Sequence, residues 1–415
     1  VLVLDGAHKG QRVPYDPSVS PTHLGWRFVD ALVGPAAPSA TSTSYLEIRG
    51  PAGWHGQPFL LKGDLNYIAT DLYFADVAAS EYPAGAQHDR DADANEVYGE
   101  RYGGEIDRVN GLADLCVGRL PATTVAQADV LVDKILRYER YLRHDPALGD
   151  VPLPASFGRA VLLGSQNWYD DTTGSLDWSA QGNEDIRHML LGVSGAFSIT
   201  RRYEDAADVP AADAGPDLAV ADHAAIVAAV AAGPNVVALS SHGSPGYLCY
   251  LGSADVDGLS STPGIWYGNA CSTNHFDDPS GPCLGERALL NPNGGGVAYV
   301  GNSRFGWTGD NPLELAFWQE MTSSGILGAM IDAAHLAAGE WGRYSLNLLG
   351  DPAMRVWSAA PLAPVVTHPA EICTGNQTVT VHVAVGGSPF ANATVSLTIP
   401  GVLSATGQTG ALAFT

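Results

Sequence analysis

The sequence predicts an α/β fold in which a mostly parallel sheet carries helices on both faces. Short apolar runs recur along the chain without alternation, a pattern typical of strands that are buried on both faces of a parallel sheet. Amphipathic segments lie between several of these runs, and strands that alternate with helices form βαβ units. Such sheets bind ligands beyond the carboxyl ends of their strands, so we expect functional residues just after strands.

The predicted strands are apolar runs that end in small or polar residues. They span residues 1–4, 59–61, 161–163, 236–239, 265–267 and 297–300. A helix is expected after Thr124, where a capping-box pattern with Gln127 precedes apolar residues spaced by three and four.

Two further helices carry start and stop signals. One spans residues 222–232 and stops at Gly233-Pro234, immediately before the strand at 236. The other begins at Asn311-Pro312, which supplies a capping residue and a first-turn proline, and it ends near Gly325.

The sequence changes in character after Trp357, and the chain divides into three predicted regions. Residues 1–155 form an N-terminal α/β subdomain and residues 156–358 a second one. Residues 359–364 are a linker rich in Pro and Ala, and the segments 379–385 and 394–399 alternate as β-strands do. We therefore expect an immunoglobulin-like β-sandwich over 361–415, although its length is short against the roughly 100 residues of a complete domain.

The amino-acid composition limits the kinds of molecule that the chain can bind. The chain has 21 Lys and Arg against 44 Asp and Glu, so its net charge is −23. A surface this acidic repels phosphate backbones and anionic lipid, and no apolar run is long enough for a membrane span. Nucleic acid and membrane surfaces are therefore not expected as partners, and the acidic balance fits an extracellular or a salt-tolerant protein that binds cations. Five cysteines, an odd number, leave at least one thiol unpaired.

The chemically informative residues follow two predicted strands. The run 236–239 precedes Ser-Ser-His242-Gly243-Ser, and the run 265–267 precedes Gly-Asn-Ala-Cys271. Cys271 follows His242 by 29 positions, a spacing that suits one crossover between neighbouring strands and places both side chains at the same sheet edge. An imidazole that takes a thiol proton creates a thiolate that attacks a carbonyl to form a thioester. Backbone N–H groups of Gly243 and Cys271 are candidates to bind the oxyanion.

These blocks resemble the cysteine peptidases of the caspase, legumain and gingipain group. Four further stretches resemble the gingipain family, peptidase family C25, in the family's order over residues 60–358. They lie at 117–121, 182–186, 295–301 and 347–352. The resemblance implies a caspase-like sheet in two subdomains, with the catalytic residues in 156–358. It also implies an endopeptidase with His242 as general acid and base, Cys271 as nucleophile and Gly243 in the oxyanion hole.

The resemblance implies three more residue roles. In gingipains an aspartate lies at the base of the S1 pocket and a Trp covers the pocket, and the matching positions are Asp185 and Trp307. A carboxylate with an aromatic wall suits an Arg or Lys side chain. The family's third catalytic member, a Glu, falls at Gln166 here. An amide can orient a His but cannot stabilise its positive form, so lower activity or another acid is expected.

A calcium loop is predicted in the N-terminal region. Oxygen ligands have EF-hand spacing at Asp89, Asp91, Asp93, Asn95, Val97 (by its carbonyl) and Glu100. Ala94 replaces the usual glycine, and no flanking helix pair is evident, so the ion is expected to be structural. The gingipain family also uses structural calcium.

Together these observations predict a calcium-stabilised, secreted cysteine endopeptidase that cleaves protein or peptide substrates after Arg or Lys as a monomer. Two alternatives remain open. One is a sortase-like transpeptidase of the same family, because an amine can open a thioester instead of water. The other is a catalytically weak adhesion or binding protein on the same fold, which Gln166 and the β-rich tail favour.

Overall fold

The computed structural model shows two compact units, Val1–Ala360 and Pro361–Thr415. For the strands before residue 68 only the backbone is described. The described residues are 2–4, 11–14, 27–30, 43–49, 59–62, 67–75, 113–140, 155–165, 178–193, 197–204, 209, 211–215, 218–278, 280–307, 310–359, 362, 364–371, 379–399 and 403–408.

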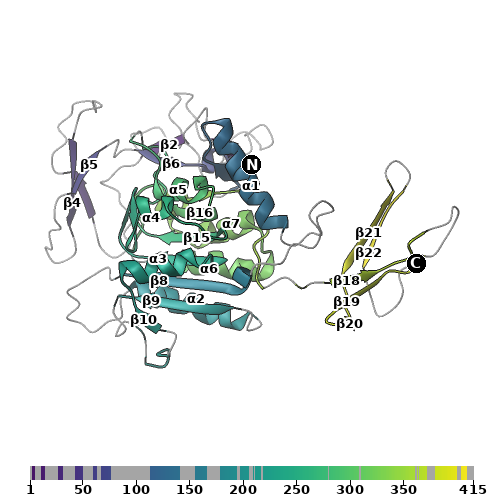
Figure 1. The fold of residues 1–415 in the computed structure, drawn as a ribbon. Helices are drawn as coiled ribbons and strands as arrows, with labels where there is room; N and C mark the ends of the chain where they lie inside the picture. Colours follow the sequence, from purple (N-terminus) through teal and green to yellow (C-terminus); the bar gives the residue numbers. More distant parts are fainter. Residues whose placement is uncertain are drawn as a thin grey trace. The chain divides into compact units, whose positions relative to one another are not determined.

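A nine-stranded sheet forms the centre of the first unit (Figure 1). Its order is β1 (Leu2–Leu4), β7 (Gly118–Leu120), β17 (Leu346–Leu349), β16 (Gly296–Asn302), β15 (Gly264–Asn269), β11 (Val236–Ser240), β8 (Arg159–Gly164), β9 (Ser198–Tyr203) and β10 (Leu218–Val220). Every pairing is parallel except that of β16 with β17. The predicted mostly parallel sheet is therefore confirmed, and its first three strands run opposite to the other six.

Helices cover both faces of this sheet. On one face pack α2 (Trp178–Gly192), α6 (Asn311–Ser323) and α7 (Leu327–Ala337), and on the other α1 (Val125–Arg140), α3 (His223–Ala231), α4 (Ser253–Asp257) and α5 (Leu284–Leu290). Successive strand residues point to opposite faces, so Ala238 joins the first layer and Leu239 the second. This two-sided burial explains why the strands read as continuous apolar runs.

One predicted strand has a different setting. The run at 59–61 is β5 (Phe59–Lys62), which pairs antiparallel with β4 (Thr43–Arg49) in a separate small sheet that also holds β3 (Arg27–Asp30). Its prediction as a strand of the parallel sheet is therefore wrong. A run of three apolar residues does not determine whether the partner strand is parallel or antiparallel, because the pairing depends on residues distant in sequence.

The helix starts follow local capping chemistry. The N–H of Gln127 donates to Thr124 Oγ1 at 3.2 Å, and the Thr124 N–H donates to Gln127 Oε1 at 3.1 Å, which confirms the capping box. The N-cap residue of α6 is Asp310, one residue before the predicted Asn311, which lies within the helix. The Asn311 side chain is therefore available for a tertiary contact.

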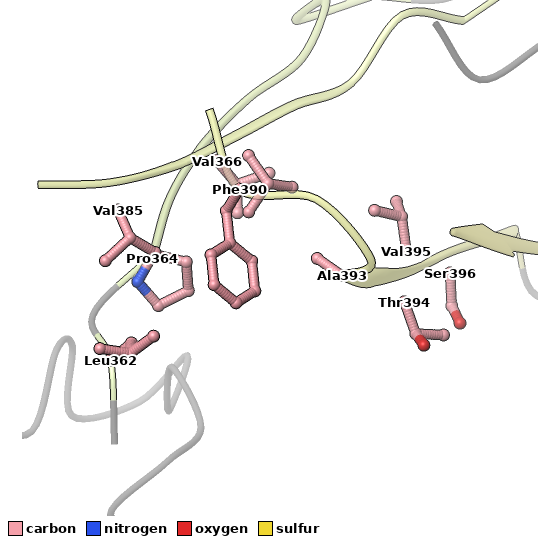
Figure 2. A pocket seen from close by; sticks show the side chains of 10 residues that line it. Leu362, Pro364, Val366, Val385, Phe390, Ala393, Thr394, Val395 and Ser396 are labelled. Carbon is pink, nitrogen blue, oxygen red and sulfur yellow. The ribbon is translucent and has the colours of Figure 1, made fainter. Parts of the chain in front are cut away.

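The second unit contains two small sheets. One holds β18 (Pro364–Thr367), β19 (His382–Val385) and β20 (Ser388–Pro389), and the other β21 (Thr394–Ile399) and β22 (Leu403–Gln408). A pocket of about 360 Å³ lies between them. Figure 2 shows side chains that line it, among them Val366 and Phe390. The immunoglobulin-like assignment stays a prediction. Among the described residues of the whole chain, no helix combines the length and hydrophobicity that crossing a membrane requires.

Candidate active site

Three neighbouring strands of the central sheet end at the same level. In the parallel register Gly164 of β8 pairs with Ser240 of β11, and Ser240 pairs with Asn269 of β15. The hydrogen-bond ladder continues one residue further, because the N–H of Ser241 donates to the Asn269 carbonyl at 3.3 Å. His242 and Cys271 therefore each lie two residues beyond a directly paired position, at one sheet edge.

Contacts at Gly243 bring the two strand ends against each other. A Cβ atom at this position would lie 2.7 Å from the Cβ of Ala270 and 2.8 Å from the Cys271 carbonyl oxygen. Only a glycine allows so close an approach without a shift of the backbone. The segment after β11 thus packs directly on the segment that carries Cys271, while the His242 side chain is exposed.

The loop that carries the thiol is fixed by hydrogen bonds to the end of β16. The Asn302 side-chain amide donates to the Ala270 carbonyl at 3.1 Å, and the N–H of Ser272 donates to the Arg304 carbonyl. Ser272 has φ +57°, a left-handed conformation that is uncommon for a non-glycine residue. The backbone on both sides of Cys271 is therefore held in one conformation, and the residue after it is strained.

The Cys271 thiol is half-buried. Its Sγ donates to the Gly306 carbonyl oxygen at 3.5 Å. Burial, followed by the negative charge of Asp310, raises the pKa of this thiol to about 11, and the contact with Gly306 opposes this rise. A thiol with this pKa is protonated at neutral pH, so its ionisation requires a base or a change in the surrounding charge.

Trp307 and Asp310 form a turn beside the thiol. The N–H of Trp307 donates to Asp310 Oδ2 at 2.8 Å, and the N–H of Asp310 donates to the Trp307 carbonyl at 3.0 Å. Trp307 and Asp310 are half-buried. The sequence prediction included Trp307 but missed Asp310, although an acid directly before Asn-Pro is a helix-start signal that could have drawn attention to it.

A polar contact ties α6 to the end of β15. The Asn269 amide donates to Asn311 Oδ1 at 3.0 Å, and a Cβ at Gly182 of α2 would meet the Asn311 amide group at 2.6 Å. One turn further along α6 lies Glu314, which is 1% exposed. The Trp318 indole donates to it at 3.4 Å, and burial raises the pKa of Glu314 to about 8 despite hydrogen bonds from Trp318 and Asn269.

The motif at 182–186 presents its two acids differently. Asp185 is exposed on α2, whereas Glu184 is buried and accepts hydrogen bonds from Arg201 Nη1 and the Tyr203 hydroxyl, both at 2.9 Å. Glu184 therefore joins α2 to β9. Among the described residues, no hydrogen bond or ion pair joins Asp185 to the segments that carry His242 or Cys271.

One group of possible metal ligands occurs among the described residues. Glu184, His188 and Asp213 have ligand atoms within 4.8 Å of one another. Arg201 pairs with Glu184, and Arg187 contacts Asp213 at 3.2 Å, so arginines already neutralise the two carboxylates. We interpret the group as an ion-pair network that holds 211–215 on α2. The predicted calcium loop at 89–100 and Gln166 lie outside the described residues.

Comparison with known protein families shows which family the chain belongs to. The family model described as peptidase family C25 matches residues 22–357. No curated protein sequence matches the chain.

Three solved structures are similar in fold. The Arg-specific cysteine proteinase gingipain R is 17% identical, with a TM-score of 0.52 over 73% of this chain and 67% of that chain. A complex of pro- and mature domains of the Porphyromonas gingivalis proteinase RgpB is also 17% identical, with a TM-score of 0.51 over 73% and 68%. A third structure, of a protease, is 15% identical, with a TM-score of 0.52 over 82% and 78%.

Proposed function

The chain belongs to peptidase family C25, a family of cysteine peptidases, and from this premise we propose that Cys271 and His242 cleave peptide bonds as a catalytic dyad. The observation that carries the proposal is the register of β11 and β15, which brings one His and one Cys to equivalent positions at a single sheet edge. In an α/β sheet this edge is where substrates bind.

The proposed reaction has two halves. His242 takes the thiol proton, and the Cys271 thiolate attacks the substrate carbonyl carbon to form a tetrahedral oxyanion. Collapse of the oxyanion breaks the peptide C–N bond, the amine leaves with the proton from His242, and a thioester remains. Water, deprotonated by His242, then hydrolyses the thioester and regenerates the thiol.

Backbone N–H groups bind the oxyanion in this proposal. Gly243 and Cys271 carry these N–H groups on segments that are packed against each other. Donors fixed in advance stabilise developing charge without reorganisation, which is worth about 10²–10³ in rate per donor. A side chain at position 243 would push the two segments apart, so the glycine serves both packing and catalysis.

A basic P1 side chain is the substrate preference that we propose. Asp310 is a half-buried carboxylate whose charge acts on the Cys271 thiol, and Trp307 lies in the same turn. A carboxylate with an aromatic neighbour favours guanidinium or ammonium groups. Asp185 stays the alternative S1 acid from the family resemblance, and its exposed position on α2 makes Asp310 the stronger candidate.

The remaining expectations are part of the same proposal. Gln166 orients His242 without stabilising its charge, calcium at 89–100 stiffens the N-terminal region, and the protein acts as an extracellular monomer.

The test is hydrolysis of peptide amides with Arg, Lys, Asp, Asn or Leu at P1, in calcium and reductant. We expect cleavage after Arg or Lys that is lost in Cys271→Ala and His242→Ala. Asp310→Asn is expected to lower kcat/KM for basic substrates roughly 10–100-fold, because the cation loses its charged partner.

Asp185→Asn is the matched control for the pocket. If it removes the preference for basic residues and Asp310→Asn does not, the pocket belongs to Asp185. Cleavage that survives Cys271→Ala would contradict the dyad itself.

A further inference from the structure

A buried side-chain amide holds the Ala270–Cys271 peptide from one side. The side-chain nitrogen of Asn302, at the end of β16, donates to the Ala270 carbonyl oxygen at 3.1 Å. On the same side of the chain, the N–H of Ser272 donates to the Arg304 carbonyl oxygen. The peptide groups before and after Cys271 are therefore both hydrogen-bonded to β16 or to the segment that follows it.

These bonds direct the N–H of Cys271 away from β16. The peptide is trans, so its N–H points opposite to its carbonyl. Because β15 lies between β16 and β11 in the sheet, this N–H faces the side of β11, whose chain continues into His242 and Gly243. The Cys271 carbonyl lies on that side too, since a Cβ at Gly243 would lie 2.8 Å from its oxygen. The N–H thus points to the place where the proposed mechanism forms an oxyanion.

The Asn302 amide is itself fixed in orientation. Asn302 is 2% exposed, and the buried Ser345 hydroxyl donates to its Oδ1 at 2.9 Å. A carbonyl oxygen only accepts, so the amide turns its nitrogen to Ala270 and its oxygen to Ser345. The Asn302 carbonyl also accepts from the N–H of Asn274 at 2.9 Å, which holds the backbone. A Cβ at Gly306 would lie 2.6 Å from the amide nitrogen, so this glycine leaves room for the amide.

We propose that Asn302, oriented by Ser345, is a positioning residue that keeps the N–H of Cys271 directed at the oxyanion. The proposal rests on the proposed function and adds the group that sets up its oxyanion site. Ser272 has φ +57°, a strained conformation, so the loop can relax when the bond to Ala270 is removed. A peptide that rotates in this way turns its N–H aside, and the developing charge loses a donor that was fixed in advance.

The experiment compares reactions of Cys271 that form an oxyanion with one that does not. Asn302→Leu keeps a side chain of similar length but removes the donor. It is compared with the parent in peptide hydrolysis, in inhibition by peptide aldehydes that end in argininal or leucinal, and in the rate of alkylation by iodoacetamide. The thiolate adds to an aldehyde carbonyl to give a tetrahedral oxyanion, as it does with a peptide, whereas alkylation displaces iodide from a saturated carbon.

The expected result is a selective loss. We expect Asn302→Leu to lower kcat roughly 10–100-fold, because a misdirected N–H loses most of the factor of about 10²–10³ that one oxyanion donor supplies. The affinity for the aldehydes should fall by a similar factor, while KM and the alkylation rate stay close to those of the parent. A residue that only supports the fold would change KM and the alkylation rate as well.

Two further variants separate positioning from stability. Ser345→Ala should lower kcat less than Asn302→Leu does, and it should cost nothing more in the Asn302→Leu background, because Ser345 acts through the amide. Asn291→Leu is the matched control, since this buried asparagine donates to the carbonyls of Val256 and Leu259 at 2.8 and 2.9 Å. Its loss should lower stability in urea without changing kcat. If Asn302→Leu does not fold, the same comparison of Ser345→Ala with the parent decides.

The outcomes separate this positioning role from the proposed function. Equal kcat and equal aldehyde affinity in the parent and in Asn302→Leu overturn the positioning role, even where peptides are cleaved. A loss of aldehyde affinity at an unchanged alkylation rate supports it, and a parent that binds an aldehyde but cleaves no peptide then counts against the peptidase assignment alone. A parent that binds neither aldehyde overturns the positioning role too, because no oxyanion is then held.

Discussion

Burial and charge conflict directly at Glu314. It is 1% exposed, and burial raises its pKa to about 8, whereas an unfolded Glu titrates near 4.3. Between these values the native state holds a proton that the unfolded chain releases. The contribution of this carboxyl to stability is therefore complete below about pH 4.3 and is lost as the pH rises through about 8.

Glu314→Gln should remove this pH dependence. An amide keeps an oxygen that can accept from Trp318 and Asn269 but cannot ionise. We expect the free energy of unfolding of the variant, relative to the parent, to rise from pH 5 to pH 8 by up to about 1.4 kcal/mol per pH unit. Urea unfolding at pH 5, 6.5 and 8 measures this difference in the free energy of unfolding, and Glu320→Gln is the control. Parallel pH curves for parent and Glu314→Gln would show that the carboxyl is ionised in the native state.

Site residues could be predicted from the sequence where they directly follow a strand in the chain. His242 and Cys271 could be found because each follows an apolar run that is visible in sequence. Asp310 could be found only as a helix-start acid, and Glu314 could not be found, because both approach the site through the packing of α6 on β15, a contact that no local pattern encodes. Asn311 was misinterpreted as a cap for the same reason: its side chain bonds to Asn269, more than forty residues away.

At the scale of elements, a buried lysine joins α1 to the end of α5. Lys134 is 1% exposed, and its Nζ lies 2.9, 2.8, 3.1 and 2.8 Å from the carbonyl oxygens of Ala288, Leu289, Asn291 and Gly294. The last carbonyl groups of a helix have no hydrogen-bond partner within the helix. A cation near the C-terminal end also interacts favourably with the helix dipole. Burial, followed by the positive charge of Arg137, lowers the pKa of Lys134 to about 7.

Lys134→Met should therefore destabilise the first unit. The side chain keeps its length, but several buried carbonyls lose their donor at about 1–3 kcal/mol each, so we expect a loss of about 3 kcal/mol or more. Asp133→Asn on the next residue removes a surface pair with Arg137 whose acid is 62% exposed, and it should cost less than about 1 kcal/mol. Urea unfolding of both variants compares the two. Equal, small losses would exclude a stabilising role for the lysine.

Elements were predictable where the local pattern alone determines them. The strands β8, β11, β15 and β16 alternate between two hydrophobic layers, and two-sided burial leaves a continuous apolar run in the sequence. The direction of β17 and the separate sheet of β5 were not predictable, because strand pairing is set by topology rather than by the residues of one strand.

At the scale of the whole molecule, the sheet crosses the predicted subdomain boundary at 155. β1 and β7 from the first region lie in the same nine-stranded sheet as the strands that carry His242 and Cys271. Arg119 of β7 contributes directly to this connection: it pairs with Asp71, and its guanidinium lies 4.5 Å from the ring of Phe276 in the loop after Cys271. Substitutions in residues 1–155 are therefore expected to alter the structure around His242 and Cys271.

Contacts of Trp357 fix the C-terminal end of the first unit. Shortening the chain on either side of this residue tests where the unit ends. The Asn235 amide donates to the Trp357 carbonyl at 2.7 Å, and the Trp357 ring packs edge-on against Phe157, with centroids 5.9 Å apart. Val356, one residue earlier, is 3% exposed. Chain beyond residue 360 belongs to the other compact unit.

A chain of residues 1–360 should therefore unfold at the same temperature as the first unit of residues 1–415 and keep its peptidase rate. A chain of residues 1–355 loses the burial of Val356, the Trp357 contacts and the partner of Asn235, and should be less stable by about 3 kcal/mol or more. Calorimetry and peptide hydrolysis on the three chains measure both quantities. A large loss already in 1–360 would mean that the second unit supports the fold of the first, and the two would then have to be treated as one folding unit.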